Sequence, residues 1–395
     1  MSLPLRIRRT LILLAAAIIC SVSGAQAAVP GVSPHRILFG QSAAFTGPAR
    51  ALGEEMRLGI EAAFRASNVR GGVFGRRLEL TSLDDAYEPE AAILNTRRLI
   101  EQSKVFALIG AVGTPTSRSA TPVAAKAGVP YIAPFTGAAF LRNPKWKNII
   151  NLRASYFQET EEMVNRLIKD LGVKKIAVLY QDDSFGLAGY RGVRRALERR
   201  NLKPAVTGVY PRNTTAVKTA LLDIKRANPG AVVLVGAYKP VASFIAWARH
   251  TGFNPIFVTL SFVGSNALVH ELGPAGVGIY VTQVVPFPTT KNLKIAADYR
   301  RDLEVHKPGA VPSFVSLEGY MAGRLTIRAL ELCGREPDRA CLLEGLNRAA
   351  TIDLGGFKLR YGKDDNQGSD AVFLTVIGEG GRYVSTEKIL RPEKR

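Results

Sequence analysis

Short apolar runs alternate along the chain with longer stretches in which apolar residues recur at helical spacing, beginning near residue 36. The short runs predict β-strands, and the longer stretches predict amphipathic helices. The predicted strands are Arg36–Ser42, Leu78–Asp84, Val105–Gly110, Lys175–Tyr180, Ala231–Gly236, Ile256–Thr259 and Ile279–Val284. The predicted helices are Glu54–Ser67, Pro89–Gln102, Thr116–Ala127, Thr160–Leu171, Tyr190–Arg200, Thr215–Asn228 and Val241–Thr251. This alternation favours an α/β fold in which helices cover both faces of mainly parallel sheets.

The strand–helix pattern restarts after residue 170, and a chain of 395 residues is long enough for two domains. Ile149–Arg153 and Tyr280–Phe287 are short extended segments that could bridge the two series, and a final strand is predicted at Ala371–Ile377. Three crossings between two lobes would form a hinged clamshell. The expected division is residues 36–153 with 286–370 in lobe 1, and residues 154–285 with 371–395 in lobe 2.

The N-terminus has the features of a secretory signal peptide. Three arginines precede an apolar run at Leu11–Cys20, and the small-residue sequence Ala-Gln-Ala follows at residues 25–27. A retained membrane anchor is the alternative, but ten apolar residues fall short of the roughly 20 that cross a bilayer. We therefore expect residues 1–27 to be cleaved after Ala27 and the mature protein to reach the periplasm.

Only two cysteines, Cys333 and Cys341, follow the predicted cleavage site. In an oxidising compartment, such a close pair forms a disulfide more often than a metal site. Closing so short a loop is worth roughly 2–3 kcal/mol on the chain-entropy account. The sequence has no Cys-x-x-Cys pair and no His-x-x-x-His spacing, so we expect no bound metal.

The chain is basic, with 53 Lys and Arg against 33 Asp and Glu and a formal net charge of +20. The basic residues are dispersed in pairs, without the long basic run or interleaved aromatics that bind nucleic acids. We therefore expect no nucleic-acid partner. The charge is consistent with a field that attracts anionic ligands.

Motifs for enzymatic chemistry are absent from the sequence. There is no Walker A loop, no G-x-G-x-x-G fingerprint and no G-x-S-x-G nucleophile elbow. The acidic pairs Asp84-Asp85 and Asp182-Asp183 consist of adjacent residues, which point apart and usually cap helices or form turns. We therefore expect neither a cofactor nor catalysis.

Four polar loops follow predicted strands, where ligands bind in open α/β sheets. These loops span residues 40–47, 110–117, 133–138 and 180–186. Thr114, Thr116 and Ser117 lie where a helix is expected to begin, so their hydroxyls and the free amides there could hold an anion. The alternative is that Thr114 or Thr116 caps its own helix.

Three segments carry a resemblance to a known family: residues 83–100, 106–138 and 176–193. Together they resemble the type I periplasmic binding proteins, in the branch of leucine/isoleucine/valine-binding receptors of ABC importers. The resemblance extends in order from about Arg36 to Ile377. It implies a two-lobed receptor with three hinge strands that closes on a small ligand and docks to a membrane permease.

The resemblance also implies a ligand site. The matching residues are Thr114, Phe135, Thr136, Gly137, Phe185, Tyr238, Ser261 and Leu52. Thr114 matches the hydroxyl residue that takes the ligand carboxylate. The loop around Gly137 matches the one that offers a backbone carbonyl and an amide to an amino acid. Phe185 and Tyr238 match aromatic walls of the second lobe, and Leu52 matches a further wall position.

Ser261 departs from the family pattern. It matches an acidic residue that holds the ligand's ammonium group, and a neutral serine cannot provide that charge-assisted bond. Either another acid such as Asp183 or Glu54 takes over, or the ligand lacks an α-amino group, so that aromatic or aliphatic carboxylates and amides become candidates. A shift of one or two residues in the match is a further alternative.

We therefore expect a monomeric periplasmic receptor of an ABC importer for branched-chain or other amino acids, or for related small carboxylates and amides. Its partners would be the small-molecule ligand and an inner-membrane ABC permease. The same fold could instead serve as a ligand sensor for a membrane kinase or chemoreceptor. An exported α/β hydrolase is disfavoured because the nucleophile elbow is missing.

Overall fold

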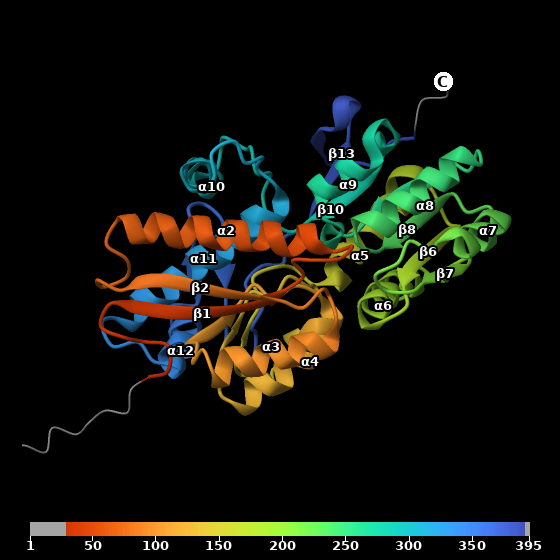
Figure 1. Ribbon diagram of the computed structural model, residues 1–395. Helices are drawn as coiled ribbons and strands as arrows, with labels where there is room; N and C mark the ends of the chain where they lie inside the picture. Colours follow the sequence, from red (N-terminus) through yellow and green to blue (C-terminus); the bar gives the residue numbers. More distant parts are fainter. Residues whose placement is uncertain (1–28, 392–395) are drawn as a thin grey trace, which may run out of the picture.

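The computed structural model describes residues 29–391. The predicted signal peptide, residues 1–27, lies outside the described residues. The described chain forms two lobes side by side, each built on its own β-sheet with helices on both faces (Figure 1). Within the described part of the chain, no helix has the length and apolar character needed to cross a membrane.

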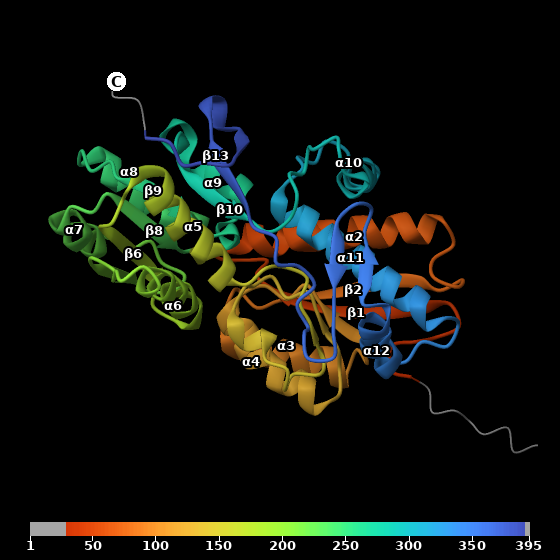
Figure 2. The ribbon, with the colours of Figure 1, turned by 180° about the vertical axis from the view of Figure 1, so that it is seen from behind.

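The first lobe contains a parallel sheet of five strands in the order β2-β1-β3-β4-β5. The strands are β1 (Arg36–Ala43), β2 (Arg77–Asp84), β3 (Ala107–Ile109), β4 (Tyr131–Ile132) and β5 (Ile149–Ile150). Its helices are α2 (Arg50–Val69), α3 (Pro89–Glu101), α4 (Thr114–Lys126), α10 (Lys294–His306), α11 (Phe314–Cys333) and α12 (Arg339–Ala349). In Figures 1 and 2, α2 and α11 cover one face of the sheet, and α3 and α4 cover the other.

The second lobe contains a sheet of seven strands in the order β14-β13-β10-β9-β8-β6-β7. The strands are β6 (Ile176–Gln181), β7 (Thr207–Tyr210), β8 (Ala231–Val235), β9 (Ile256–Thr259), β10 (Tyr280–Gln283), β13 (Phe373–Ile377) and β14 (Tyr383–Thr386). Its helices are α5 (Tyr156–Leu171), α6 (Ser184–Glu198), α7 (Lys218–Ala227), α8 (Tyr238–His250) and α9 (Ser265–Leu272). The strands from β6 to β10 are parallel, whereas β13 and β14 form an antiparallel edge.

Local sequence signals explain where several helices begin. Pro89 is the first residue of α3, where its missing N–H costs nothing. Ser155 caps α5 in a capping box with Gln158. Asp183 caps α6 by accepting hydrogen bonds from the backbone of Phe185 and Gly186. The prediction that the Asp182-Asp183 pair caps a helix is therefore confirmed for Asp183.

The chain passes between the two sheets three times, after β5, after β10 and after the hairpin of β11 (Thr351–Asp353) and β12 (Lys358–Arg360). The first and third crossings lie side by side, because Asn151 donates its backbone N–H to the carbonyl of Asn366 at 2.8 Å. In return, Gly368 donates to the carbonyl of Asn151 at 2.8 Å. These hydrogen bonds pair the two segments that connect the lobes.

Every predicted strand and helix overlaps an observed element. The pattern of residues 286–370 predicts no elements, but the structure has α10, α11, α12 and the β11–β12 hairpin there. Most residues of α11 are buried, so its sequence lacks the polar face that marks a surface helix. Cys333 at the end of α11 and Cys341 in α12 form a disulfide with a Cα–Cα distance of 5.7 Å.

Candidate functional site

Loops from the two lobes meet where the strands end. The loops after β2 and β4 in the first sheet contact the turn after β9 in the second sheet through aromatic rings. In open α/β sheets, ligands bind at these carboxyl ends of the strands. The junction between the lobes is therefore the candidate site.

Five buried rings form what we call the aromatic cluster: Tyr87, Phe135, Tyr156, Phe185 and Phe262. The Phe262 ring lies at the centre, with its centroid 5.3 Å from that of Phe135, 4.5 Å from that of Phe185 and 6.1 Å from that of Tyr87. Tyr156 and Phe185 are 5.6 Å apart. Because Phe135 and Tyr87 belong to the first lobe and Phe262 to the second, the cluster joins the two lobes.

A tight turn after β9 presents Phe262. The turn is a short 3-10 helix, Ser261–Val263, and it ends at Gly264 with φ of 80°. A Cβ atom at this glycine would lie 2.4 Å from Cδ2 of Leu52. Glycine is required there both by the left-handed backbone and by the close approach of the first lobe. Leu52, a predicted wall residue, therefore packs against the turn that carries Phe262.

Thr114 and Thr136 face each other at the edge of the cluster. Their hydroxyl oxygens are 2.6 Å apart, and both side chains are buried. The N-cap of α4 is Gly113, and no side chain caps this helix. Thr116 instead donates its hydroxyl to the carbonyl of Val112 at 2.5 Å. The alternative that Thr114 or Thr116 caps its own helix is therefore wrong.

Gly137 lets the first lobe approach the start of α5. Its carbonyl accepts a hydrogen bond from the backbone of Tyr156 at 2.7 Å. A Cβ atom at Gly137 would lie 2.5 Å from Cδ1 of Tyr156, which leaves no room for a side chain. The loop that contains Phe135, Thr136 and Gly137 is thus held against the Tyr156 ring.

A buried ion cluster lies beside the aromatic cluster. Arg153 is fully buried, and its Nη2 atom is 3.0 Å from Oε1 of Glu159. Its Nη1 atom is 3.5 Å from Oε2 of Glu318 on α11. The guanidinium carbon also lies 5.0 Å from the centroid of the Phe135 ring. Arg153 therefore links a helix of each lobe to the aromatic cluster.

Ser261 belongs to this ion cluster. Its backbone N–H donates to Oε2 of Glu159 at 2.9 Å, and its hydroxyl donates to Oε1 of the same carboxylate at 3.0 Å. Arg153 also donates to the Ser261 hydroxyl. Thr282 donates to Oε2 of Glu159 at 2.6 Å. Ser261 is thus tied to residues of the protein itself.

Burial and the neighbouring charges shift the ionisation of this cluster. Burial raises the pKa of Glu318 to about 7, although Arg153 lowers it. Burial acts to lower the pKa of Arg153, but the carboxylates of Glu318 and Glu159 raise it above its ordinary value. Burial and the charge of Arg153 lower the pKa of Arg142 to about 9. Arg153 therefore stays charged, whereas Glu318 titrates near neutrality.

Neither alternative acid stands ready for an ammonium group in this structure. Asp183 accepts hydrogen bonds from the backbone of Phe185 at 2.8 Å and from Nε2 of Gln181 at 2.6 Å. The nearest guanidinium nitrogen of Arg212 is 3.7 Å from its other side. Glu54 is exposed and lines the outer surface of the junction rather than the cluster.

Tyr238 and Leu52 lie at the border of the cluster. The hydroxyl of Tyr238 accepts a hydrogen bond from the backbone of Ala51 at 3.4 Å, across the lobe junction. Tyr238 also lines a groove of about 1080 Å³ on the outside of this junction, together with Glu55 and Phe314. Of the predicted site residues, Tyr238 therefore lies at the wall of this groove.

A polar latch closes the junction near the start of α3. Arg212 and Asn213 follow β7, and both reach Glu88 of the first lobe. Arg212 Nη2 is 2.6 Å from Oε2 of Glu88, and Asn213 Nδ2 is 2.7 Å from Oε1. The latch is partly exposed, so it stabilises closure only modestly.

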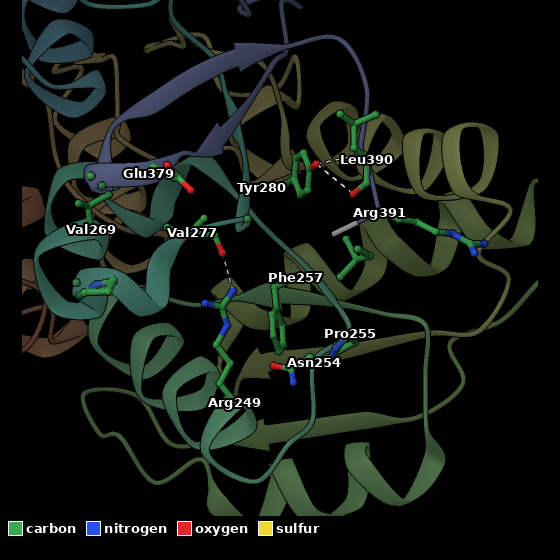
Figure 3. Close-up of a pocket in the computed structure, with 16 residues that line it drawn as sticks. Arg249, Asn254, Pro255, Phe257, Val269, Val277, Tyr280, Glu379, Leu390 and Arg391 are labelled. Atoms are coloured by element: carbon green, nitrogen blue, oxygen red, sulfur yellow. Dashed lines mark hydrogen bonds between the residues drawn. The ribbon is translucent and has the colours of Figure 1, made fainter. Parts of the chain in front are cut away.

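A second large cavity lies in the second lobe, and Figure 3 shows the residues that line it. Its volume is about 1030 Å³, and its lining includes Arg249, Phe257, Tyr280 and Leu390. Ile256 and Tyr280 begin their strands, so the cavity lies at the opposite edge of the sheet from the aromatic cluster. No group of side chains within residues 29–391 is arranged to hold a metal ion.

Several residues of the site escape the sequence analysis: Tyr87, Arg153, Tyr156, Glu159 and Phe262. Phe262 directly follows Ser261 and lies just after the predicted strand Ile256–Thr259. This strand-end position is the sequence feature that could have marked it as a site residue. Arg153 ends one of the predicted bridging segments, where a buried charge signals a role in the structure or the site. The partners of Arg153 are distant in sequence, and only the fold reveals them.

Comparisons with known proteins agree with this architecture. A sequence profile of the family described as "Periplasmic binding protein" matches residues 37–382. The Leu/Ile/Val-binding protein homolog 7 of Brucella abortus is 26% identical over 385 residues, which cover 92% of this chain and 94% of that protein.

Solved structures show the same fold. A possible leucine/isoleucine/valine-binding protein from Rhodopirellula baltica is 36% identical, with a TM-score of 0.86, and the match covers 93% of this chain and 100% of that one. A fatty acid ABC transporter substrate-binding protein from Thermomonospora curvata is 20% identical, with a TM-score of 0.81 and coverage of 92% and 95%. The family profile, the two-lobed fold and the strand-end junction lead to one assignment: this chain belongs to the type I periplasmic binding proteins, in the group that resembles leucine/isoleucine/valine-binding proteins.

Proposed function

We propose that this protein is the periplasmic ligand receptor of an ABC importer, and that it closes its lobes around a small carboxylate. The observation that carries the proposal is the aromatic cluster. Phe262 of the second lobe touches Phe135 and Tyr87 of the first, so these contacts form only when the lobes close. A ligand that adds contacts to both lobes would stabilise this closed state.

A carboxylate suits the first lobe. The hydroxyls of Thr114 and Thr136 lie together at the N-terminus of α4, a 13-residue helix whose dipole favours an anion. The related proteins from Brucella abortus and Rhodopirellula baltica are named for leucine, isoleucine and valine, which all carry a carboxylate. The fold neighbour named for fatty acids indicates that the fold by itself does not decide the ligand.

The remaining parts of the proposal follow from the family. The chain is exported through a cleaved signal peptide at residues 1–27, acts as a monomer and delivers its ligand to an inner-membrane permease. The ligand-binding residues are Thr114, Phe135, Thr136, Gly137, Phe185, Tyr238, Ser261 and Leu52, to which we add the rings of Tyr87, Tyr156 and Phe262. The protein catalyses no reaction.

A thermal-shift screen of the mature protein with amino acids, matching carboxylates and amides tests this proposal. A ligand at 100 times its dissociation constant adds about 2.7 kcal/mol of stability, which is a visible shift. Small-angle X-ray scattering should then show that the same compound decreases the radius of gyration. A hit that leaves the shape unchanged would contradict binding between the lobes.

Two variants of α6 provide a matched control. Phe185→Ala should weaken ligand binding at least tenfold, because Phe185 lies in the aromatic cluster. Tyr190→Ala on the same helix should leave the ligand affinity unchanged. The Tyr190 ring stacks on that of Tyr180, with centroids 5.1 Å apart, and is not part of the aromatic cluster. Uptake of the labelled ligand by cells that lack this protein should fall. Unchanged uptake would contradict the transport role.

A further inference from the structure

We propose that the cavity at the N-terminal ends of β9 and β10, which we call the edge cavity, is a second ligand site that takes an amphipathic anion. Such a ligand has an acidic head group and an apolar body. The edge cavity has a volume of about 1030 Å³, which is enough for a small molecule. Its lining contains no residue of the aromatic cluster, so this inference goes beyond the proposed function and does not depend on it.

The first observation is the apolar wall of the edge cavity. Phe257 and Ile256 at the start of β9 form its buried part. Val277 and Leu390 line the same cavity and remain 37% and 64% exposed. Single exposed apolar residues are ordinary, but apolar residues gathered around a hollow are typical of binding sites. The apolar body of a ligand would remove this surface from water.

The second observation is a guanidinium group without an acidic partner. Arg249 lies half-buried in the last turn of α8 and donates through Nη2 to the carbonyl of Val277 at 2.7 Å (Figure 3). Through Nη1 it donates to the carbonyl of Ala275. The other N–H groups of Arg249, including that of Nε, have no acceptor within residues 29–391. A bound anion would supply the counter-charge and accept from these donors.

The other charges of the lining do not neutralise Arg249. They are Arg391, which donates to the carbonyl of Leu171 at 3.2 Å, and Glu379 in the turn between β13 and β14. Burial lowers the pKa of Arg249 and is the one cause of its shift, so Glu379 is not its counter-ion. Two cations against one acid leave the lining with an excess of positive charge, which favours an anion.

The third observation concerns the other polar groups of the lining. The hydroxyl of Tyr280 accepts from the backbone N–H of Leu390 at 2.8 Å and donates to its carbonyl at 3.3 Å (Figure 3). This hydroxyl is therefore used to hold the C-terminal segment against the cavity. The side chain of Asn254 is exposed and has no hydrogen bond to another described residue. Arg249 and Asn254 are thus the groups that would meet an acidic head group.

A purely structural role for Arg249 is the competing explanation, because its hydrogen bonds fix the turn at residues 275–277. Arg339 of the first lobe provides a comparison. It is also half-buried, donates to the carbonyls of Phe106 and Val105 at 2.9 Å, and has a pKa that burial lowers. Arg339 lines neither of the two large cavities. Arg339→Met is therefore the matched control for Arg249→Met.

Isothermal titration calorimetry with three probes of equal chain length tests the head group: octanoate, 1-octanol and octyltrimethylammonium, each below the concentration at which it forms micelles. We expect octanoate to bind at least roughly tenfold more tightly than the other two, because only octanoate can accept charge-assisted hydrogen bonds from Arg249. Equal binding of the three probes would overturn the preference for an anion. Absence of octanoate binding would overturn the site.

Arg249→Met tests where octanoate binds. We expect its octanoate affinity to fall at least roughly tenfold and its octanol affinity to stay within about twofold, since the apolar wall is unchanged. Arg339→Met should keep the octanoate affinity of the unaltered protein. An equal loss in both variants would overturn the role of Arg249.

Phe185→Ala separates this inference from the proposed function. The variant alters the aromatic cluster at the lobe junction and leaves the edge cavity intact. We expect it to bind octanoate as the unaltered protein does. If Phe185→Ala abolishes octanoate binding while Arg249→Met preserves it, octanoate occupies the lobe junction. That result would overturn the edge cavity as a site and support the proposed receptor function.

Val277→Asp is a second variant that keeps Arg249 in place. It puts a carboxylate on the wall beside the guanidinium, where it competes with the head group of a ligand. We expect octanoate affinity to fall at least roughly tenfold, whereas Val305→Asp on α10, also at an exposed valine, should have no effect. Unchanged octanoate binding by Val277→Asp would overturn the inference.

A free amphiphile and an anionic membrane lipid share this chemistry, and we assign the site to the free amphiphile because the apolar wall lines a cavity. Sedimentation with phosphatidylglycerol vesicles distinguishes the two sources. We expect the protein to stay in the supernatant. Co-sedimentation that Arg249→Met abolishes would overturn the assignment to a free ligand.

Discussion

Replacing Arg153 with methionine tests how the two lobes are held at the ion cluster. Methionine has a long, flexible side chain that fills much of the same space without a charge. The substitution removes the counter-charge of Glu159 and Glu318, both of which are buried. It also removes a hydrogen bond to Ser261 and the contact with the Phe135 ring.

The magnitude follows from the burial. Removing one partner of a buried ion pair typically costs about 3–5 kcal/mol, because the remaining charge stays buried without compensation. Arg153 is 0% exposed in its side chain, and so is Glu159. We therefore expect Arg153→Met to lower the free energy of unfolding by about 3–5 kcal/mol at neutral pH.

Glu318→Gln should behave differently. The pKa of Glu318 is raised to about 7, so the folded protein carries it partly protonated at neutral pH. Burial already disfavours the charged form of Glu318, so replacing it with glutamine should lower the free energy of unfolding by under about 1 kcal/mol at this pH. Arg153 keeps Glu159 as its partner in this variant.

Urea unfolding followed by circular dichroism at neutral pH measures both variants. Arg166→Met on α5 is the matched control, because its Nε atom lies 2.6 Å from Oε1 of Glu162 but its side chain is 25% exposed. Such a surface pair is worth under about 1 kcal/mol. A loss below about 1 kcal/mol for Arg153→Met, or an equal loss for Glu318→Gln, would refute the reasoning.

Three further predictions concern other parts of the molecule. Burial raises the pKa of Glu55 from 4.5 to about 7, so its contribution to stability is present at low pH and is lost as pH rises toward 7. In urea unfolding at about pH 8, the Glu55→Gln variant should therefore be more stable than the unaltered protein. Reducing the disulfide between Cys333 and Cys341 should lower the free energy of unfolding by roughly 2–3 kcal/mol. Arg212→Ala should weaken ligand binding about two- to fivefold by calorimetry, because it loses the latch to Glu88, and high salt should reduce the difference.

Each of these predictions can fail. Equal pH dependence of unfolding for Glu55→Gln and the unaltered protein would contradict the assigned protonation. A reduced protein with unchanged stability would contradict a stabilising disulfide. An Arg212→Ala variant that binds as tightly as the unaltered protein in low salt would show that the latch does not hold the lobes together. Asn213→Ala is a useful control, since it removes a neutral hydrogen bond to the same Glu88 carboxylate.

Much of the fold follows from local patterns. Strands such as β6 and β8 are short apolar runs because both faces of a parallel sheet are buried. Helices such as α3 begin at recognisable residues, and their apolar residues recur on one face. The pattern fails for α11, because a helix buried on most sides has no polar face to mark it.

The candidate site could be predicted only in part. The sequence pattern predicts that Thr114 and Phe135 follow the ends of strands. The family resemblance adds Phe185, Tyr238 and Leu52 to the predicted site residues. That Thr114 meets Thr136, 22 positions away, depends on how β3 and β4 lie in the sheet. Sequence order determines which residues end strands, whereas sheet order determines which ends meet.

Ser261 shows the limit most clearly. From the sequence, it is a neutral residue at a position where an acid is expected. In the structure, Glu159 lies 102 positions away and accepts its hydrogen bonds, and Arg153 neutralises that carboxylate from 108 positions away. The sequence alone therefore determined the lobes and the strand ends. Only the tertiary structure decided how the buried charges pair and which rings face each other, because those contacts join chain segments that become neighbours after both sheets have formed.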